Sequence, residues 1–358
     1  MARGNRSQPH CCVMWRSDLG GRDPRALADA LVRAAGLGSA RTLEALAGGR
    51  NNRVYAVDLA SGHRAVMKIY FRHPGDTRDR LRAEWRFLRH ANQLAPGRVA
   101  TPFACDENAD AALYEFIDGA RYSRADASAV EAASEFFSLV AAPGRADGLD
   151  PASEACFSIT EHLATVESRV RRLCGTNIEG PHADEARAFI ACFERTWRVV
   201  RATVEANCRS FGVDPQASLA AVDIVASPSD FGFHNAIRTP RGPVFIDFEY
   251  AGRDDPAKLV CDFFCQPSVP VPASLHEAFQ AGTLDPLGLS HHRARAKVLL
   301  DAYRVKWIAI MLNEFVPVDE SRRVFSDEDD RAARRLRQLD TARRSLRVIE
   351  DNPVYQGN

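Results

Sequence analysis

Three polar residues in the second half of the chain have the types and spacing of a phosphoryl-transfer centre. Asp230 and Asn235 form the pattern Asp-x-x-x-x-Asn, and Asp247 follows the apolar run 244–246. Phosphoryl transfer requires an acceptor hydroxyl held in line and cations that neutralise charge on the phosphate oxygens. Asp230 would orient that hydroxyl and accept its proton. The oxygens of Asn235 and Asp247 suit Mg²⁺, which binds few protein oxygens alongside phosphates and water.

The spacing of Asp and Asn is not specific by itself, because a turn capped by both side chains has the same pattern. Residues earlier in the chain add to it. Gly48, Gly49 and Asn51 lie between two segments of strand character, where backbone N–H groups could approach phosphates, although a hairpin turn would look the same. Lys68 interrupts an apolar strand and could reach the α- and β-phosphates, although an edge-strand charge is the alternative.

A glutamate on the next predicted helix extends the series. Glu84 is placed to pair with Lys68 and fix its position, whereas alone it would be a solvated surface residue. Taken in order, the chain offers a glycine turn, a strand lysine, a helix glutamate, a linker, Asp-x-x-x-x-Asn and a strand aspartate. This order is typical of a kinase-like nucleotide site.

The elements that must position these residues fall into two parts. The first part is rich in strands, and the second is mostly helical apart from an interruption at 219–250. We expect an α+β, protein-kinase-like two-lobed fold with a disordered tail (1–20), a small strand-rich nucleotide-binding N-lobe (21–118) and a larger helical C-lobe (119–358) with the catalytic loop and acceptor site. Strands are expected near 54–57, 65–70, 99–105 and 111–117, and helices at 24–36, 76–93, 126–141, 157–173, 183–210, 288–315 and 328–350.

The segment Ile-Asp-Phe-Glu-Tyr-Ala-Gly at 246–252, followed by Asp255 and Pro256, carries a family resemblance. It is similar to the corresponding segment of the aminoglycoside phosphotransferase and choline kinase superfamily. The resemblance implies an enzyme that uses ATP or GTP with Mg²⁺ to phosphorylate a hydroxyl of a small molecule. It also implies residue roles: Asp230 as the catalytic Asp, Asn235 and Asp247 as metal ligands, Lys68 and its partner Glu84 at the phosphates, and the backbone of Glu115, Phe116 and Ile117 at the base.

The chain departs from the family pattern at the catalytic loop. Where the family usually has His-Gly-Asp, this sequence has Pro228, Ser229 and Asp230. We interpret His234 as a loop or substrate-facing residue and not as a replacement for the missing histidine. The second acidic residue after Asp-Pro is displaced to Asp262. A catalytically impaired pseudokinase with a regulatory or nucleotide-binding role is therefore the alternative to an active kinase.

The acceptor is not identified by the sequence. Glu249, Tyr303 and Trp307 are candidate contacts, and the last two share a helical face as either a pocket wall or part of the core. The neutral composition, with 47 basic and 47 acidic residues, does not suggest a site for a strongly cationic acceptor. A sugar, an amino alcohol or a related metabolite stays open.

Composition also restricts the function class. Because basic and acidic residues balance, the net charge does not attract the protein to nucleic acid. No apolar run is long enough to span a membrane. The N-terminus lacks a signal-peptide core, and the nine scattered cysteines are typical of reduced thiols. We expect a cytoplasmic monomer or homodimer that binds neither nucleic acid nor membrane.

Overall fold

The computed structural model describes residues 23–46, 52–72, 76–142, 146, 148–316 and 328–351. The chain divides into two compact units. The first contains the described residues up to Phe71 together with Phe103–Tyr114, and the second contains Arg72–Pro102 and the described residues from Glu115 onward.

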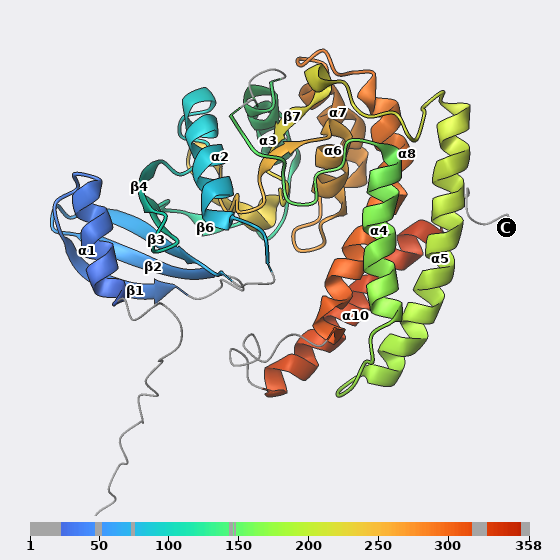
Figure 1. The fold of residues 1–358 in the computed structure, drawn as a ribbon, viewed down its shortest axis with the longest axis horizontal. Coiled ribbons are helices and arrows are strands. Elements are labelled where there is room, and N and C mark those ends of the chain that lie inside the picture. The colour runs from blue at the N-terminus through green and yellow to red at the C-terminus, as the bar shows by residue number, and fades with distance from the viewer. Residues whose placement is uncertain are drawn as a thin grey trace, which may run out of the picture. The chain divides into compact units, whose positions relative to one another are not determined.

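The first unit is a sheet with one helix packed on it. Its strand order is β1-β2-β3-β5-β4, in which β2 pairs antiparallel with both β1 and β3. Helix α1 (Pro24–Ala34) lies across this sheet (Figure 1) and begins where the Asp23 side chain accepts a hydrogen bond from the Arg25 N–H. Leu31 of α1 is buried in one core with Val57 and Met67 of the sheet. The strands are β1 (Ala40–Leu46), β2 (Asn52–Leu59), β3 (Arg64–Tyr70), β4 (Pro102–Asp106) and β5 (Ala111–Glu115).

The second unit is mostly helical. Helices α4, α5, α8 and α10 lie side by side (Figure 1), with α8 in contact with the other three. The start of α4 is fixed by a capping box between Ser158 and Glu161. The helices are α2 (Arg80–Leu94), α3 (Ala127–Val140), α4 (Ile159–Cys174), α5 (Ala183–Ser210), α6 (Pro256–Cys265), α7 (His276–Leu284), α8 (His292–Met311) and α10 (Glu328–Glu350).

Two small sheets interrupt these helices and carry residues 225–254. Strand β7 (Val225–Ser227) pairs antiparallel with β10 (Gly252–Asp254). Strand β8 (Ala236–Thr239) lies between β6 (Ala120–Arg121) and β9 (Gly242–Phe245). The close approach of Gly119 to β8 allows no side chain, because a Cβ there would lie 2.3 Å from the carbonyl oxygen of Arg238. The chain after Glu115 is thus held against the hairpin formed by β8 and β9.

The structure confirms the predicted α+β class and most of the predicted helices. The predicted helices 183–210 and 328–350 agree with α5 and α10, whereas the predicted helix 288–315 begins later, at His292, and ends in a 3₁₀ turn (Leu312–Phe315). Helix α7 was not predicted, and α6 and the strand before the Gly48–Gly49 turn, β1, were expected without bounds. Helix α6 has an evident start, in which the Asp255 side chain caps the helix and Pro256 is its first residue.

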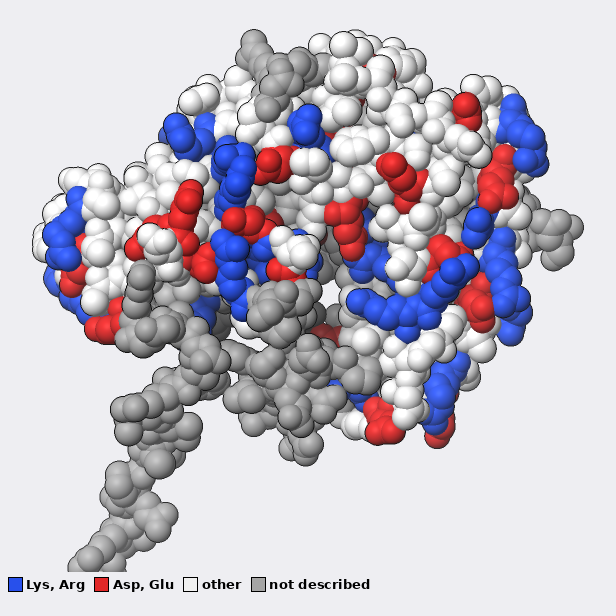
Figure 2. Space-filling model, in the orientation of Figure 1, with Lys and Arg blue, Asp and Glu red and all other residues white. Residues whose placement is uncertain are grey.

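The charged surface of the second unit is mixed in sign. Basic and acidic side chains are interspersed over α4 and α5 on the face in Figure 2, and several form pairs one turn apart, such as Arg198 with Glu194 and Arg201 with Glu205. Within the described ranges, no helix is both long and apolar enough to cross a membrane.

Candidate active site

The predicted catalytic loop, residues 228–235, brings Asp230 and Asn235 into direct contact. The Asn235 amide nitrogen donates to the backbone carbonyl of Asp230 at 2.9 Å and lies 3.4 Å from its Oδ2. His234 Nε2 lies 3.2 Å from Asp230 Oδ1. The Asp230 side chain is one-third exposed, at 33%. The loop therefore presents a hydrogen-bonded carboxylate that solvent or a ligand can still reach.

Two residues of this region hold left-handed backbone conformations. Ser229, next to Asp230, has φ 64°, and Asp247, just after β9, has φ 68°. Non-glycine residues rarely adopt this region, and such outliers cluster at ligand and active sites. Ser229 stands where the family motif has glycine, so the conformation is the one that glycine would adopt freely. Asp247 is half-buried and lies two residues after the end of β9.

Aromatic packing supports the loop from inside the second unit. Phe231 is buried among Phe137, Phe245 and Phe263, with ring centroids 4.3–5.4 Å apart. Phe248 packs on Phe87 of α2 at 4.8 Å. The residues that immediately follow Asp230 and Asp247 are thus anchored in the core.

A buried lysine sits behind the loop. Lys258 of α6 pairs with Asp254 at 2.7 Å and with Asp262 at 3.4 Å, and its Nζ lies 3.4 Å from the Ser229 hydroxyl. Burial disfavours its charged form, but the two carboxylates outweigh that effect and raise the pKa of Lys258 above its ordinary value. Lys258 is therefore a charged group that positions the left-handed Ser229. Sequence reasoning missed it, although acidic residues four positions before and after a lysine in an apolar helix are a visible signal.

Further buried polar residues connect α4, α6 and α8. His162 contacts Tyr303 Oη through Nδ1 at 2.7 Å and Asp255 Oδ2 through Nε2 at 3.0 Å. Asp262 accepts from Lys306 and from the Trp307 indole N–H, both at 2.8 Å. Arg295 of α8 pairs with Asp255. We call this set, with Lys258 and Asp254, the buried polar network: His162, Asp254, Asp255, Lys258, Asp262, Arg295, Tyr303, Lys306 and Trp307.

The network decides how two predicted acceptor residues are placed. Tyr303 is 2% exposed with its hydroxyl bound to His162. Trp307 is half-buried with its indole N–H directed at Asp262. Their interactions match the core interpretation of the helix, and we do not include them in the acceptor site proposed below.

The third predicted acceptor contact, Glu249, lies in another buried ion pair. It is 5% exposed, and its Oε2 lies 3.8 Å from the Arg80 Nε of α2. Arg80 also pairs with Asp76 at 2.6 Å. Burial and the adjacent Glu249 charge raise the pKa of Tyr250 above its ordinary value. We therefore assign Glu249 to the support of the turn after Asp247.

The remaining predicted residues lie in both units. Lys68 of β3 is buried at 7%, with Nζ 5.1 Å from the Tyr70 ring centroid, and Glu84 of α2 is 4% exposed. Their pairing stays a prediction because it joins residues of the two units. The Glu115 carboxylate accepts from the backbone and hydroxyl of Thr101, which fixes the start of the segment that continues through half-buried Phe116 and Ile117. Gly48, Gly49 and Asn51 lie outside the described residues.

Solved structures of low sequence identity share this fold. The chain is similar to a choline kinase from Cryptosporidium parvum Iowa II, with TM-score 0.56, 13% identity, and 87% of this chain and 91% of that chain covered. For a spectinomycin phosphotransferase in complex with ADP and spectinomycin, the TM-score is 0.52 and the identity 11%, with 91% of this chain and 99% of that chain covered. For a choline/ethanolamine kinase family protein from Mesorhizobium loti, the TM-score is 0.50 and the identity 18%, with 93% of this chain and 95% of that chain covered.

These likenesses show that the chain has the kinase-like fold. The comparison with curated proteins found no match. A sequence model described as the phosphotransferase enzyme family matches residues 42–297, well over half of the chain, and the protein therefore belongs to that family.

Proposed function

We propose that this phosphotransferase moves the γ-phosphate of ATP or GTP to a hydroxyl group of a small metabolite. The observation that carries the proposal is the contact of Asp230 with Asn235 in a loop that is open to solvent on one side and anchored in the core on the other. A partly exposed carboxylate on an anchored loop is the group that an in-line acceptor hydroxyl requires.

In this proposal Asp230 binds the acceptor hydroxyl and accepts its proton. General-base groups must lie within hydrogen-bond reach of the proton that they remove, which restricts the acceptor oxygen to the neighbourhood of the Asp230 oxygens. His234, 3.2 Å from Asp230 Oδ1, holds one of these oxygens, and Asn235 holds the main chain behind it. Both neighbours act as positioning residues that orient the carboxylate.

The donor atoms of Asn235 and Asp247 fit a divalent cation such as Mg²⁺. Because the Asn235 amide nitrogen is engaged by Asp230, its oxygen Oδ1 is the atom that can bind a metal. The carboxylate of Asp247 supplies a second hard oxygen donor, and Mg²⁺ prefers one or two such groups plus phosphates and water. A bound Mg²⁺ would neutralise charge on the phosphate oxygens.

For the nucleotide we propose Lys68 at the phosphates with Glu84 as its partner, the turn at Gly48, Gly49 and Asn51, and the backbone of 115–117 at the base. Burial of Lys68 in an apolar strand supports a specific role for its ammonium, since lysines are rarely buried without a partner. We further propose that the protein works in the cytoplasm as a monomer or homodimer.

The acceptor class that we propose is a sugar, an amino alcohol or a related hydroxyl compound. Choline, ethanolamine and spectinomycin appear in the names of proteins that share the fold. With identities of 18% or lower, those names do not choose among acceptors for this chain.

A pseudokinase remains the second candidate because Pro228 stands where the family usually has histidine. The contact between Lys258 and Ser229 weighs against it, since it supports the loop from the side of α6. Retention of Asp230, Asn235 and Asp247 also favours an active enzyme.

A nucleotide-consumption screen tests the proposal. Sugars, amino alcohols and aminoglycosides are supplied with ATP or GTP and Mg²⁺, and Asp247→Ala serves as the blank. We expect at least one hydroxyl compound to stimulate nucleoside diphosphate formation by the natural chain and not by the blank. Nucleotide binding without turnover for any compound would favour the pseudokinase.

A further inference from the structure

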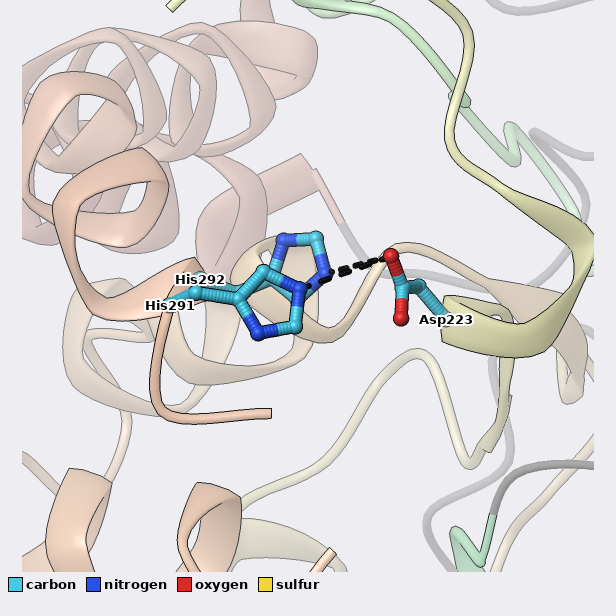
Figure 3. A group of neighbouring side chains, drawn as sticks. All are labelled: Asp223, His291 and His292. Carbon is cyan, nitrogen blue, oxygen red and sulfur yellow. Dashed lines mark hydrogen bonds and ion pairs between the residues drawn. The ribbon is translucent and has the colours of Figure 1, made fainter. Parts of the chain in front are cut away.

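Three potential metal ligands gather in the second unit, where the 3₁₀ turn Ala221–Asp223 meets the start of α8. Asp223 ends the turn, His291 precedes α8 and His292 is its first residue. Figure 3 shows the two imidazole rings beside the Asp223 carboxylate. One ligand atom from each residue lies within 4.8 Å of the others. None of the three belongs to the catalytic loop.

The separations match those of ligands around one small ion. His291 Nε2 lies 3.5 Å and His292 Nε2 lies 3.3 Å from the same atom, Asp223 Oδ2. Zinc bonds of about 2.0–2.2 Å in a tetrahedron separate the ligand atoms by roughly 3.3–3.6 Å. Two edges of the coordination polyhedron are therefore already at the required length.

The state of His292 is an independent indication. Its side chain is only 8% exposed, yet Nε2 makes no geometrically acceptable hydrogen bond although it faces the carboxylate. The neighbouring cations are neutralised elsewhere, since Arg293 pairs with Asp285 and Arg295 with Asp255.

We propose that Asp223, His291 and His292 bind a divalent transition metal ion, with Zn²⁺ as the expected ion and water completing the coordination. Two imidazole nitrogens and one carboxylate oxygen suit zinc, whereas Mg²⁺ selects all-oxygen ligands. The bound ion ties the turn before β7 to the first residue of α8. It is distinct from the metal proposed for the phosphates, and it does not depend on the phosphoryl-transfer function.

The alternative is that Asp223 only complements the positive N-terminal end of α8, where a carboxylate is favourable without any metal. In that case the histidines lie beside the carboxylate without sharing an ion with it. Zinc binding separates the two explanations, because only the metal site requires all three side chains together.

The test measures Zn²⁺ bound per chain by equilibrium dialysis of the full-length protein with excess Mg²⁺ and without nucleotide. The variants are His291→Ala, at an exposed position that tolerates truncation, and Asp223→Asn, which keeps the shape. His63→Ala, which removes an exposed histidine from the β2–β3 turn, is the matched control. Asp247→Ala measures any zinc that binds at the proposed phosphate site. Zinc held by cysteine thiols contributes equally to the natural chain and all variants, because none of the substitutions removes a cysteine.

We expect His291→Ala and Asp223→Asn each to lose one tightly bound Zn²⁺ relative to the natural chain, with the affinity of that site falling more than about 100-fold, because loss of a ligand exceeds loss of a second-layer contact. His63→Ala and Asp247→Ala retain it. Zn²⁺ should also raise the thermal unfolding midpoint of the natural chain and not of Asp223→Asn. Equal zinc content in the natural chain, His291→Ala and Asp223→Asn overturns the proposal.

Discussion

The loop around Asp230 and the buried polar network use similar residue types in opposite ways. Asp230 in the loop and Asp247 after β9 are partly exposed, and Ser229 and Asp247 have left-handed backbone. In the network, Asp254, Asp255 and Asp262 are 0–2% exposed and are held by Lys258, His162, Arg295 and Lys306. Charges that are fully paired inside the protein support the structure, whereas a carboxylate that is fixed but reachable can act on a substrate.

The two regions meet at Lys258, which pairs with the network and reaches Ser229 of the loop. Replacing Lys258 with methionine should leave Asp254 as an uncompensated buried charge and cost about 3–5 kcal/mol of unfolding free energy. Urea denaturation measures this loss. Lys297→Met, at an exposed position of α8, is the control and should stay within about 0.5 kcal/mol. A Lys258→Met loss no larger than that of the control would show that the network does not stabilise the unit.

The network should also make stability depend on pH. Burial lowers the pKa of His162, but the hydrogen bond to Asp255 and its charge outweigh burial and raise the pKa to about 9. The stabilisation is complete below the ordinary histidine pKa of about 6.5 and is lost as the pH rises through 9. Relative to His162→Gln, the natural chain should lose on the order of 3 kcal/mol across this window. Parallel pH curves for the two proteins would contradict the raised pKa.

In the loop, Gly232 tests how tightly the backbone is packed near Asp230. A Cβ at this position would lie 2.7 Å from His234 Nδ1 and 2.9 Å from Gln266 Cγ. Gly232→Ala should destabilise the protein by about 1–3 kcal/mol and lower kcat, because the His234 ring that contacts Asp230 must move. Gly148→Ala, where a Cβ meets nothing within 4 Å, is the matched control. An unchanged kcat for Gly232→Ala would mean that the position of His234 does not matter for turnover.

The smallest expected effect concerns Ser229. Ser229→Gly removes a left-handed strain of about 1–2 kcal/mol but adds about 0.5–1 kcal/mol of backbone entropy and loses the contact with Lys258. The net change in unfolding free energy should be within about 1 kcal/mol. Ser229→Val, with a branched side chain at positive φ, should lose about 1–3 kcal/mol. Chemical denaturation of both variants checks the order, and a valine variant as stable as the glycine variant would refute the left-handed assignment.

Much of the fold was predictable because it rests on local signals. Capping residues and periodicity are visible in the sequence. They indicate the helix that begins after Asp23, the long amphipathic helix at 183–210 and the strand that contains Lys68. Helix α7 was missed because nine residues give little periodicity. Helix α6 was left without bounds because Lys258 and Asp262 interrupt its apolar run, although both are buried.

The candidate site was only partly predictable. The spacing of Asp230 and Asn235 indicated their proximity, because an intervening turn brings such residues together, and the structure places them in contact. The left-handed Ser229, the Lys258 contact and the cluster at Asp223 could not be predicted, since each depends on residues that meet only through tertiary packing. Tyr303 looked like a possible pocket wall because sequence spacing does not distinguish a buried helical face from one that lines a cavity.

The most direct test of the account is the rate of phosphoryl transfer by Asp230→Asn. With an acceptor found by the nucleotide-consumption screen, kcat and the nucleotide Kd are measured for this variant and for Asp184→Asn, an exposed control on α5. We predict that kcat falls about 10²- to 10⁴-fold for Asp230→Asn, which is the contribution of a general base, while its nucleotide Kd is unchanged. Asp184→Asn should keep both the kcat and the Kd of the natural chain. A kcat for Asp230→Asn equal to that of the natural chain would contradict the assignment of Asp230 as the catalytic residue.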